Sequence, residues 1–204
     1  MDAQDWNARY AGRELVWGSG PNRFLAGEAS ELEPGRALDL ACGEGRNAIW
    51  LAEHGWRATG VDFAEAGIAK ARQLAAERGV EVEWHVADLL AYEPAGRAYE
   101  LVLLFYLQLP RPKLEPILRR AAAAVAPGGT FLLVGHHARN LAEGWGGPSD
   151  AAVLYGPEDV VPALARLEVE RAEAVDRPVE TPEGERTAID VLVRASAPGP
   201  APPR

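Results

Sequence analysis

The feature that most constrains this chain is a short apolar strand that runs directly into a turn of small residues. Residues 37–47 read Ala-Leu-Asp-Leu-Ala-Cys-Gly-Glu-Gly-Arg-Asn. Glycine lets such a turn close without a side chain in the way, and the helix that follows offers unpaired N–H groups and the positive end of its dipole. The pattern therefore predicts a strand, a turn and a helix, with bare backbone able to approach a ligand at the turn.

Two carboxylates follow neighbouring strands near this turn. Asp39 ends the first strand, and Asp62 ends the next apolar strand, 23 residues later, where it can accept hydrogen bonds from both hydroxyls of a ribose. Glycine turns also bind the pyrophosphate of nicotinamide dinucleotides, but Asp39 and Glu44 would repel a pyrophosphate and suit a cationic ligand. S-adenosylmethionine carries an ammonium and a sulfonium, so the turn favours this nucleoside. Asp39 either reaches the ammonium or only braces the loop.

Apolar runs alternate with helical patterns along the chain, which is typical of a parallel sheet covered by helices on both faces. The patterns predict strands at 36–41, 57–62, 81–86, 99–104 and 130–135, helices at 46–54, 65–78 and 112–125, and a turn at 127–129. The last two strands, 167–175 and 186–194, are joined by Thr-Pro-Glu-Gly with no room for a crossover helix, so they must form a hairpin. The predicted fold is α/β: a Rossmann-like, doubly wound, mostly parallel seven-stranded sheet that ends in an antiparallel hairpin.

The length of 204 residues suits a single domain, expected over residues 1–196. The tail at 197–204 has four prolines in eight residues and is expected to be disordered. The single cysteine, Cys42, cannot form an internal disulfide, and Asp2 and Asp5 stand where a signal peptide would need positive charge. These features predict a cytoplasmic protein.

Charge and composition also limit the classes of partner that the protein is expected to bind. The formal net charge of −9 disfavours nucleic acid, because phosphate backbones require a basic face. The longest apolar run has seven residues, Leu101 to Leu107, and a membrane span needs about 18. Four histidines and one cysteine form no two ligand pairs at zinc-like spacing, so no metal is predicted. The expected partner is a small-molecule substrate, and the oligomeric state stays open.

The chain resembles the class I S-adenosylmethionine-dependent methyltransferases, and within them it is most similar to the tellurite-resistance B-type and thiopurine-type small-molecule enzymes. The resemblance extends from Trp6 to Arg194 and is sharpest in the first half. One departure is Ala41, which stands where the family has the first glycine of its turn. The residues that carry the resemblance are Trp6, Arg9, Tyr10, Trp17, Pro21, Asn22, the stretch 38–47, Gly55, Val61 and Asp62.

This resemblance implies a role for each matching position around the cofactor. Gly43 and Gly45 would line its methionine part, Asp62 would hold the ribose, and Phe63 would pack near the adenine. Asp88 would accept the adenine amino group while the next N–H meets the ring, although Asp88 can also act as a helix N-cap. The full set of expected cofactor-binding residues is Trp17, Asn22, Asp39, Ala41, Gly43, Gly45, Asn47, Asp62, Phe63, Asp88, Leu89 and Phe105.

Methyl transfer from a sulfonium depends on alignment and exclusion of water, so no invariant base is required. A thiolate, a chalcogen-derived anion or a halide needs only to be held, whereas a hydroxyl or phenol needs a proton acceptor. His136 and His137, directly after the fifth strand, are the candidates for this acceptor. Tyr106 and Arg177 are weaker catalytic candidates, and Arg177 could gather an anionic substrate. Each of these residues can equally be a surface or capping group.

Two segments are expected to cover the site. Residues 1–30 place aromatic rings that would fold over the cofactor, and residues 136–156 form a connection too long for an ordinary strand-to-helix loop. Either segment can equally be a plain surface element. The predicted function is transfer of a methyl group from S-adenosylmethionine to a small acceptor such as a thiol, a chalcogen oxyanion or another soft nucleophile. The alternatives are a module that binds S-adenosylmethionine or S-adenosylhomocysteine without turnover, and a nicotinamide-dependent oxidoreductase.

Overall fold

The computed structural model describes residues 2–199 and contains one seven-stranded sheet with the strand order β3-β2-β1-β4-β5-β7-β6. The first five strands pair in parallel, and β7 pairs antiparallel to both β5 and β6. This arrangement confirms the predicted fold. The strands are β1 (Arg36–Leu40), β2 (Arg57–Asp62), β3 (Glu83–Val86), β4 (Tyr99–Phe105), β5 (Val125–His136), β6 (Glu168–Thr181) and β7 (Gly184–Ser196).

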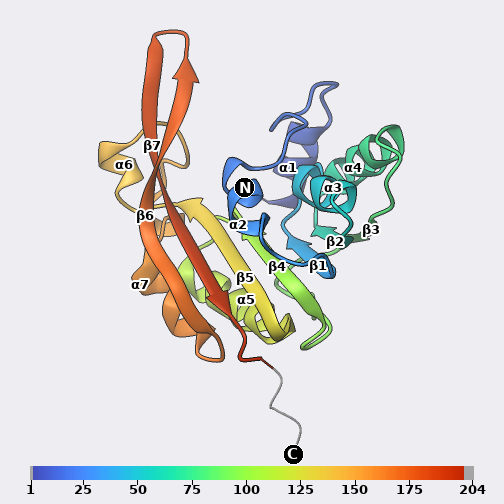
Figure 1. Cartoon of the computed structure of the whole chain (residues 1–204). Helices are drawn as coiled ribbons and strands as arrows, with labels where there is room; N and C mark the ends of the chain where they lie inside the picture. The colour runs from blue at the N-terminus through green and yellow to red at the C-terminus, as the bar shows by residue number, and fades with distance from the viewer. Residues whose placement is uncertain (1, 200–204) are drawn as a thin grey trace, which may run out of the picture.

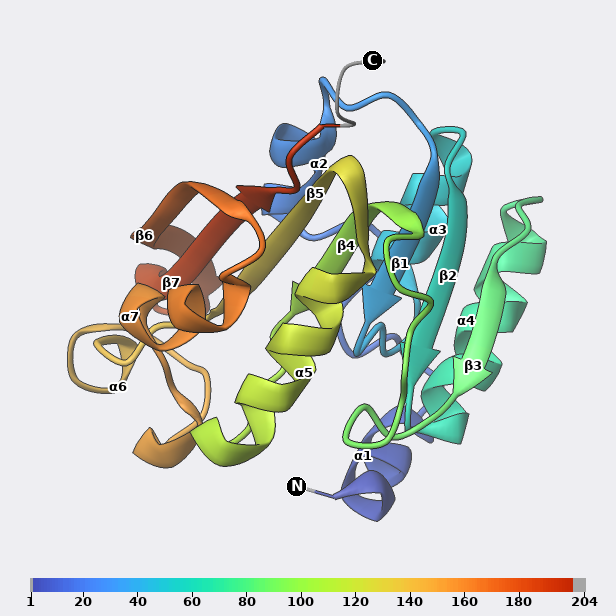
Figure 2. The same cartoon turned by 90° about the horizontal axis from the view of Figure 1, so that it is seen from below.

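Helices cover both faces of this sheet (Figure 1 and Figure 2). They are α1 (Ala3–Tyr10), α2 (Arg23–Ala29), α3 (Arg46–Glu53), α4 (Glu65–Glu77), α5 (Arg111–Ala124), α6 (Asn140–Glu143) and α7 (Pro157–Val160), with 3-10 turns at Ala151–Val153 and Val161–Leu164. In Figure 2, α5 and α7 lie on one face, whereas α3 and α4 lie on the other. Within residues 2–199, no helix combines the length and apolar character needed to cross a membrane.

Alternation along the strands divides the core into two layers and decides which way the polar side chains point. Leu38 and Leu40 pack with α5 in the first layer, whereas Ala37 packs with α2 and α3 in the second. Asp39 is two residues from Ala37 along the strand, so its side chain points to the same face of the sheet, the one covered by α3. The carboxyl ends of β1, β2 and β4 meet at the edge from which the glycine turn emerges, which is where ligands bind in open α/β sheets.

The terminal hairpin is longer than the apolar pattern indicates. The prediction of strands at 167–175 and 186–194 was wrong in extent, because β6 and β7 pair continuously up to a two-residue turn at Pro182 and Glu183. Beyond residue 176 the ribbon extends past the sheet (Figure 1), and most of its side chains there are exposed. With no face buried against a core, this segment has no apolar alternation from which its strands could be predicted.

Two further boundaries differ from the prediction. The predicted turn at 127–129 lies inside β5, where the pairing with β4 is interrupted between Tyr99 and Leu101, so the Pro-Gly-Gly sequence forms an irregularity within the strand. The third strand begins at Glu83 instead of residue 81. At the end of the chain, the Ala197 N–H donates to the Gly129 carbonyl (2.9 Å), and residues 200–204 of the predicted tail lie outside the described residues.

Candidate functional site

The turn between β1 and α3 has the backbone conformation that its small residues predict. Ala41, Gly43 and Gly45 all have positive φ values, of 60°, 55° and 79°. Ala41 adopts this left-handed conformation at a cost of about 1 to 2 kcal/mol, because its Cβ approaches the following carbonyl. Tyr106, directly after β4, is also left-handed at a φ of 54°. Strained non-glycine residues are concentrated at functional sites, and both of these lie at the carboxyl edge of the sheet.

Asp62 connects the end of β2 to this turn. Its Oδ2 accepts the Gly43 N–H (2.9 Å) and its Oδ1 accepts the Ala64 N–H (2.8 Å). Burial raises the pKa of Asp62, although these backbone hydrogen bonds act in the opposite direction. Each carboxylate oxygen can accept a second hydrogen bond, so the contacts that fix the turn leave capacity for the hydroxyls of a ribose.

Asp39 is the least satisfied polar group of the site. Its side chain is 1% exposed, and neither carboxylate oxygen has a hydrogen-bond partner among the described residues. Burial raises the pKa of Asp39 to about 7, although the backbone of Ala48 and the positive charge of Arg46 act in the opposite direction. A buried carboxylate without a partner is costly unless a cationic group compensates it. This orphaned acid beside the glycine turn therefore fits the positively charged amino acid part of S-adenosylmethionine.

The raised pKa of Asp39 predicts a pH-dependent stability. Below pH 7 the folded protein keeps this carboxyl protonated, whereas the unfolded chain ionises it above about pH 4. The folded state then binds more protons, so the free energy of unfolding falls as the pH rises between these values. In Asp39→Asn we expect this loss to be absent, so that the variant gains stability relative to the wild type between pH 5 and pH 8. Thermal unfolding of both proteins at the two pH values tests this, and an unchanged difference in Tm would contradict it.

The N-terminal segment packs directly on the turn through an aromatic cap, formed by Trp6, Tyr10 and Trp17. The Trp6 and Tyr10 rings stack at 5.4 Å, and the Trp17 indole donates to the Tyr10 hydroxyl (3.3 Å). A Cβ at Gly43 would lie 2.7 Å from that hydroxyl oxygen. The predicted cover over the turn is thus in contact with it, and Gly43 leaves the space that Tyr10 needs.

Two charged residues of the turn hold the same segment. Glu44 pairs with the Lys70 ammonium (2.9 Å) and accepts the Val16 N–H (2.9 Å), while Arg46 donates to the Trp17 carbonyl (3.0 Å). Glu44 was expected to suit a cationic ligand through its charge, but that charge is paired with Lys70. Because the carboxylate is buried and paired, it fixes the N-terminal segment instead.

The other expected cofactor residues divide into buried and exposed groups. The Asn22 N–H donates to the Asn47 side chain (2.8 Å), which joins the start of α2 to α3. Phe105 and Leu89 are buried and Phe63 is half-buried. Asp88 is exposed at the end of β3, where it accepts the Leu90 N–H (2.8 Å) and closes a turn. No helix begins there, so the alternative of a helix N-cap does not apply.

Three of the four catalytic candidates meet around a residue that sequence reasoning missed. Asp190 of β7 is 0% exposed. Its Oδ2 accepts from the Tyr106 hydroxyl (2.7 Å) and from Arg177 Nε (2.6 Å), and its Oδ1 lies 3.2 Å from His136 Nδ1. The Tyr106 and His136 rings are 4.9 Å apart. We call these four residues the Asp190 cluster.

The charges within this cluster reinforce one another. Burial alone would raise the pKa of Asp190, but His136, Arg177 and Tyr106 together bring it below its usual value. The pKa of Tyr106 is raised by burial and by the Asp190 charge, so this hydroxyl stays protonated and donates. The pKa of Arg177 is raised because its bond to Asp190 outweighs its partial burial. The cluster is therefore an ionised carboxylate held by fixed donors.

The fourth candidate, His137, lies apart from this cluster. Successive residues of a strand point to opposite faces, and the His137 Nδ1 accepts the Arg139 N–H (3.0 Å) in the loop that follows. Asp190 itself could have been found from a single acid within the apolar run 188–193, because a charge in a central strand is rarely buried without a partner. Within residues 2–199, no group of three or more metal-ligating side chains is present.

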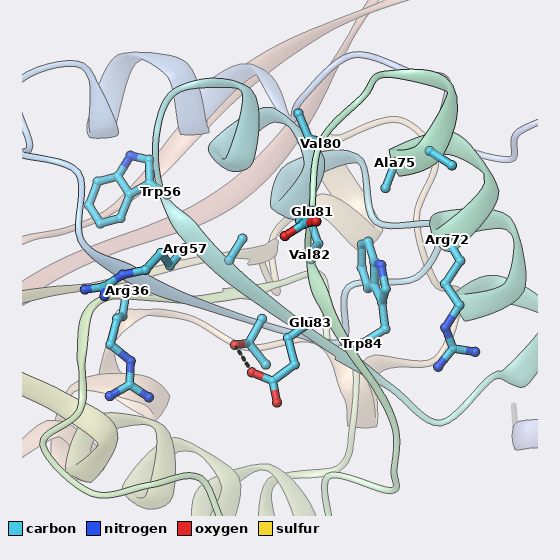
Figure 3. A pocket seen from close by; sticks show the side chains of 13 residues that line it. Arg36, Trp56, Arg57, Arg72, Ala75, Val80, Glu81, Val82, Glu83 and Trp84 are labelled. Atoms are coloured by element: carbon cyan, nitrogen blue, oxygen red, sulfur yellow. Dashed lines mark hydrogen bonds between the residues drawn. The ribbon is translucent and has the colours of Figure 1, made fainter.

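A cavity of about 740 Å³ lies at the opposite edge of the sheet, at the amino ends of β1 and β2 (Figure 3). The Thr59 hydroxyl in its wall donates to Glu83 (3.3 Å). None of the expected site residues lines this cavity. Its lining residues are Arg36, Trp56, Arg57, Ala58, Thr59, Arg72, Ala75, Ala76, Val80, Glu81, Val82, Glu83 and Trp84.

Comparison with known proteins gives partial matches to methyltransferases. Residues 37–129 match the family model described as a methyltransferase domain. The ubiquinone biosynthesis O-methyltransferase of Bordetella avium (strain 197N) is 36% identical over 103 residues, which are 50% of this chain and 42% of that protein. The ribosomal RNA small subunit methyltransferase C of Alcanivorax borkumensis is 31% identical over 107 residues, or 50% of this chain and 32% of that protein. The matches thus span less than half the length of these relatives.

Solved structures share the fold over nearly the whole chain. The N-methyltransferase NodS from Bradyrhizobium japonicum WM9, solved with S-adenosylhomocysteine, aligns with a TM-score of 0.73 at 18% identity, covering 96% of this chain and 98% of that one. TehB from Haemophilus influenzae aligns with a TM-score of 0.72 at 16% identity, covering 97% and 68%. At these identities the likeness concerns the fold alone, so it does not extend to the acceptor that TehB-type enzymes use.

Residues 37–129 therefore match a methyltransferase domain, and the curated relatives that the chain matches are methyltransferases, in agreement with the class that the sequence predicted. This segment contains the glycine turn, Asp39 and Asp62, whereas the acid and the histidine of the Asp190 cluster lie beyond it.

Proposed function

We propose that the protein transfers the methyl group of S-adenosylmethionine to a small-molecule acceptor that binds beside the Asp190 cluster. The observation that carries this proposal is the arrangement of two polar groups at one edge of the sheet. The turn with Asp39 and Asp62 follows β1 and β2, and the Asp190 cluster lies at the ends of β4 and β5. A methyl donor in the first would face an acceptor in the second.

In this proposal the chain's own residues hold the cofactor and exclude water. Gly43 and Gly45 shape the turn beside the methionine part, Asp39 faces the cationic amino acid part, and Asp62 accepts the ribose hydroxyls. When bound, the cofactor supplies an electrophilic methyl group on a sulfonium sulfur. The aromatic cap covers this ligand, which excludes water from the reaction. Residues 136–156 cover the acceptor side.

The acceptor in this proposal is a small, soft nucleophile such as a thiol, and nucleic acid is excluded. A ribosomal RNA methyltransferase is among the relatives, but this chain has a formal net charge of −9, which opposes binding to phosphate backbones. Arg177 is paired with Asp190 inside the cluster, so its charge is not free to gather an anionic acceptor. The cluster therefore suits a neutral, protic acceptor better than an oxyanion.

The test is release of S-adenosylhomocysteine by the purified full chain with a panel of thiols, phenols, iodide and tellurite. We expect binding of S-adenosylhomocysteine by calorimetry and turnover with at least one thiol or phenol. Binding without turnover of any acceptor would favour the alternative of a regulatory module that only holds the nucleoside. Absence of saturable binding would overturn the assigned site. Turnover of tellurite alone would exclude the protic acceptor.

A further inference from the structure

The side chains of His136 and Asp190 lie opposite each other in the antiparallel pair of β5 and β7. Their Cα atoms are register partners, so both side chains point to the α3 face of the sheet. Asp39, at the end of β1, points to the same face. The register of the terminal hairpin thus places a buried acid beside His136 on the cofactor side.

The contacts of Asp190 indicate which ring nitrogen of His136 carries the proton. Tyr106 and Arg177 both donate to Oδ2, whereas Oδ1 lies 3.2 Å from His136 Nδ1, and in this geometry both of these buried atoms lack a hydrogen-bond partner within residues 2–199. A buried carboxylate oxygen requires a donor, so Nδ1 carries the proton. With the proton on Nδ1, the other ring nitrogen, Nε2, keeps its lone pair.

We infer that His136 is the proton acceptor for a protic substrate and that Asp190 is the positioning residue that fixes its tautomer. This inference rests on the proposed function. The acceptor's sulfur or oxygen forms a bond to the methyl carbon and loses its proton to His136 Nε2, while the electrons of the broken carbon–sulfur bond stay with the cofactor's sulfur. The imidazolium then returns its proton to solvent. The arrangement works because Asp190 stabilises the imidazolium without taking its proton.

The groups around His136 support this role. Asp190 faces it from β7, Arg177 from β6 and Tyr106 from the end of β4, while the backbone at Gly147 packs against the ring. Farther away, the Tyr155 hydroxyl donates to the Leu107 carbonyl (3.2 Å) and is not bonded to the ring. Arg177 and Asp190 balance each other, so the nearest uncompensated proton acceptor is the imidazole itself.

The tautomer can be measured without cofactor or turnover. Long-range proton–nitrogen correlation spectra of the full chain at pH 8.5 distinguish the two neutral tautomers, and His136→Gln assigns the signal among the four histidines. We expect the Nδ1–H form in the wild type and the Nε2–H form in Asp190→Asn, whose amide can donate to Nδ1. The exposed Asp176→Asn carries the same charge change in the same hairpin and should leave the tautomer unaltered. An Nε2–H form in the wild type, or no change in Asp190→Asn, would overturn the inference.

The second test measures kcat of the wild type and of the variants, with the thiol or phenol of the panel that the wild type methylates fastest as the acceptor. General base catalysis contributes about 10²- to 10⁴-fold, so kcat in His136→Gln and Asp190→Asn should fall by at least about tenfold near pH 7. The defect should shrink as the pH passes the acceptor's own pKa, because an ionised acceptor needs no base. A defect of constant size at every pH would indicate a merely structural role. Failure of the wild type to turn over any acceptor would instead count against the proposed function, while the tautomer still tests the pair.

Discussion

Replacing Gly45 with alanine is expected to destabilise the protein by about 2 to 5 kcal/mol. At a φ of 79°, alanine costs about 1 to 2 kcal/mol. The new Cβ would also lie 2.4 Å from the Trp84 ring and 2.8 Å from the Ala71 Cβ, and such overpacking costs about 1 to 3 kcal/mol. Urea denaturation measures the loss as a lower midpoint at unchanged slope.

Two control variants separate the causes of this effect. Gly18→Ala has a comparable φ of 72° with no atom within 4 Å of the new Cβ, so it isolates the backbone cost. Gly27→Ala lies inside α2 with neither strain nor contact, and we expect it to stabilise the fold slightly, because alanine is the better helix former. If Gly45→Ala and Gly18→Ala lose equal stability, the packing of Trp84 under the turn does not constrain this position.

Replacing Asp62 with alanine is expected to weaken binding of S-adenosylhomocysteine by tenfold or more. The change removes the acceptor for the Gly43 and Ala64 N–H groups, and each buried donor left without a partner costs about 1 to 3 kcal/mol. The loss of the ribose contact adds to this, because the turn no longer holds its shape when the ligand arrives. Calorimetry gives the affinity directly.

Asp62→Asn and Glu65→Ala serve as controls for this prediction. The asparagine amide keeps one acceptor oxygen, so its affinity should lie between those of the wild type and the alanine variant. Glu65 is an exposed residue of the adjacent first turn of α4, and its removal should leave the affinity within about twofold. Wild-type affinity in Asp62→Ala would show that this carboxylate is only a brace for the loop.

The sequence predicts the cofactor half of the molecule well, since its signals are local. The turn needs positive φ values at 41, 43 and 45, where small residues are tolerated best, and each apolar run of the parallel sheet is bounded by polar or glycine residues. Asp39 and Asp62 lie within the last two residues of β1 and β2, so their place at the carboxyl edge could be derived from topology alone.

The acceptor half could not be predicted in the same way, because its contacts join residues far apart in the chain. The Tyr106 hydroxyl and Asp190 are 84 positions apart, and only the register of β5 against β7 brings the latter opposite His136. The sequence places His136 and His137 equally near the site, whereas strand alternation separates them. Glu44 illustrates the same limit, since its partner Lys70 is distant in sequence.

The pairing of β6 and β7 has a consequence for how relatives of this chain can differ in length. Insertions at Pro182 and Glu183 only lengthen a projecting tip, so variation there is inexpensive. A single residue added between Gly184 and Asp190 would shift every later side chain of that strand to the reverse side of the pleat. The side chain of Asp190 would then point away from His136 and into the core layer that packs against α5. Relatives should therefore differ in length only at the tip, while the number of residues in the paired part of β6 and β7 stays constant.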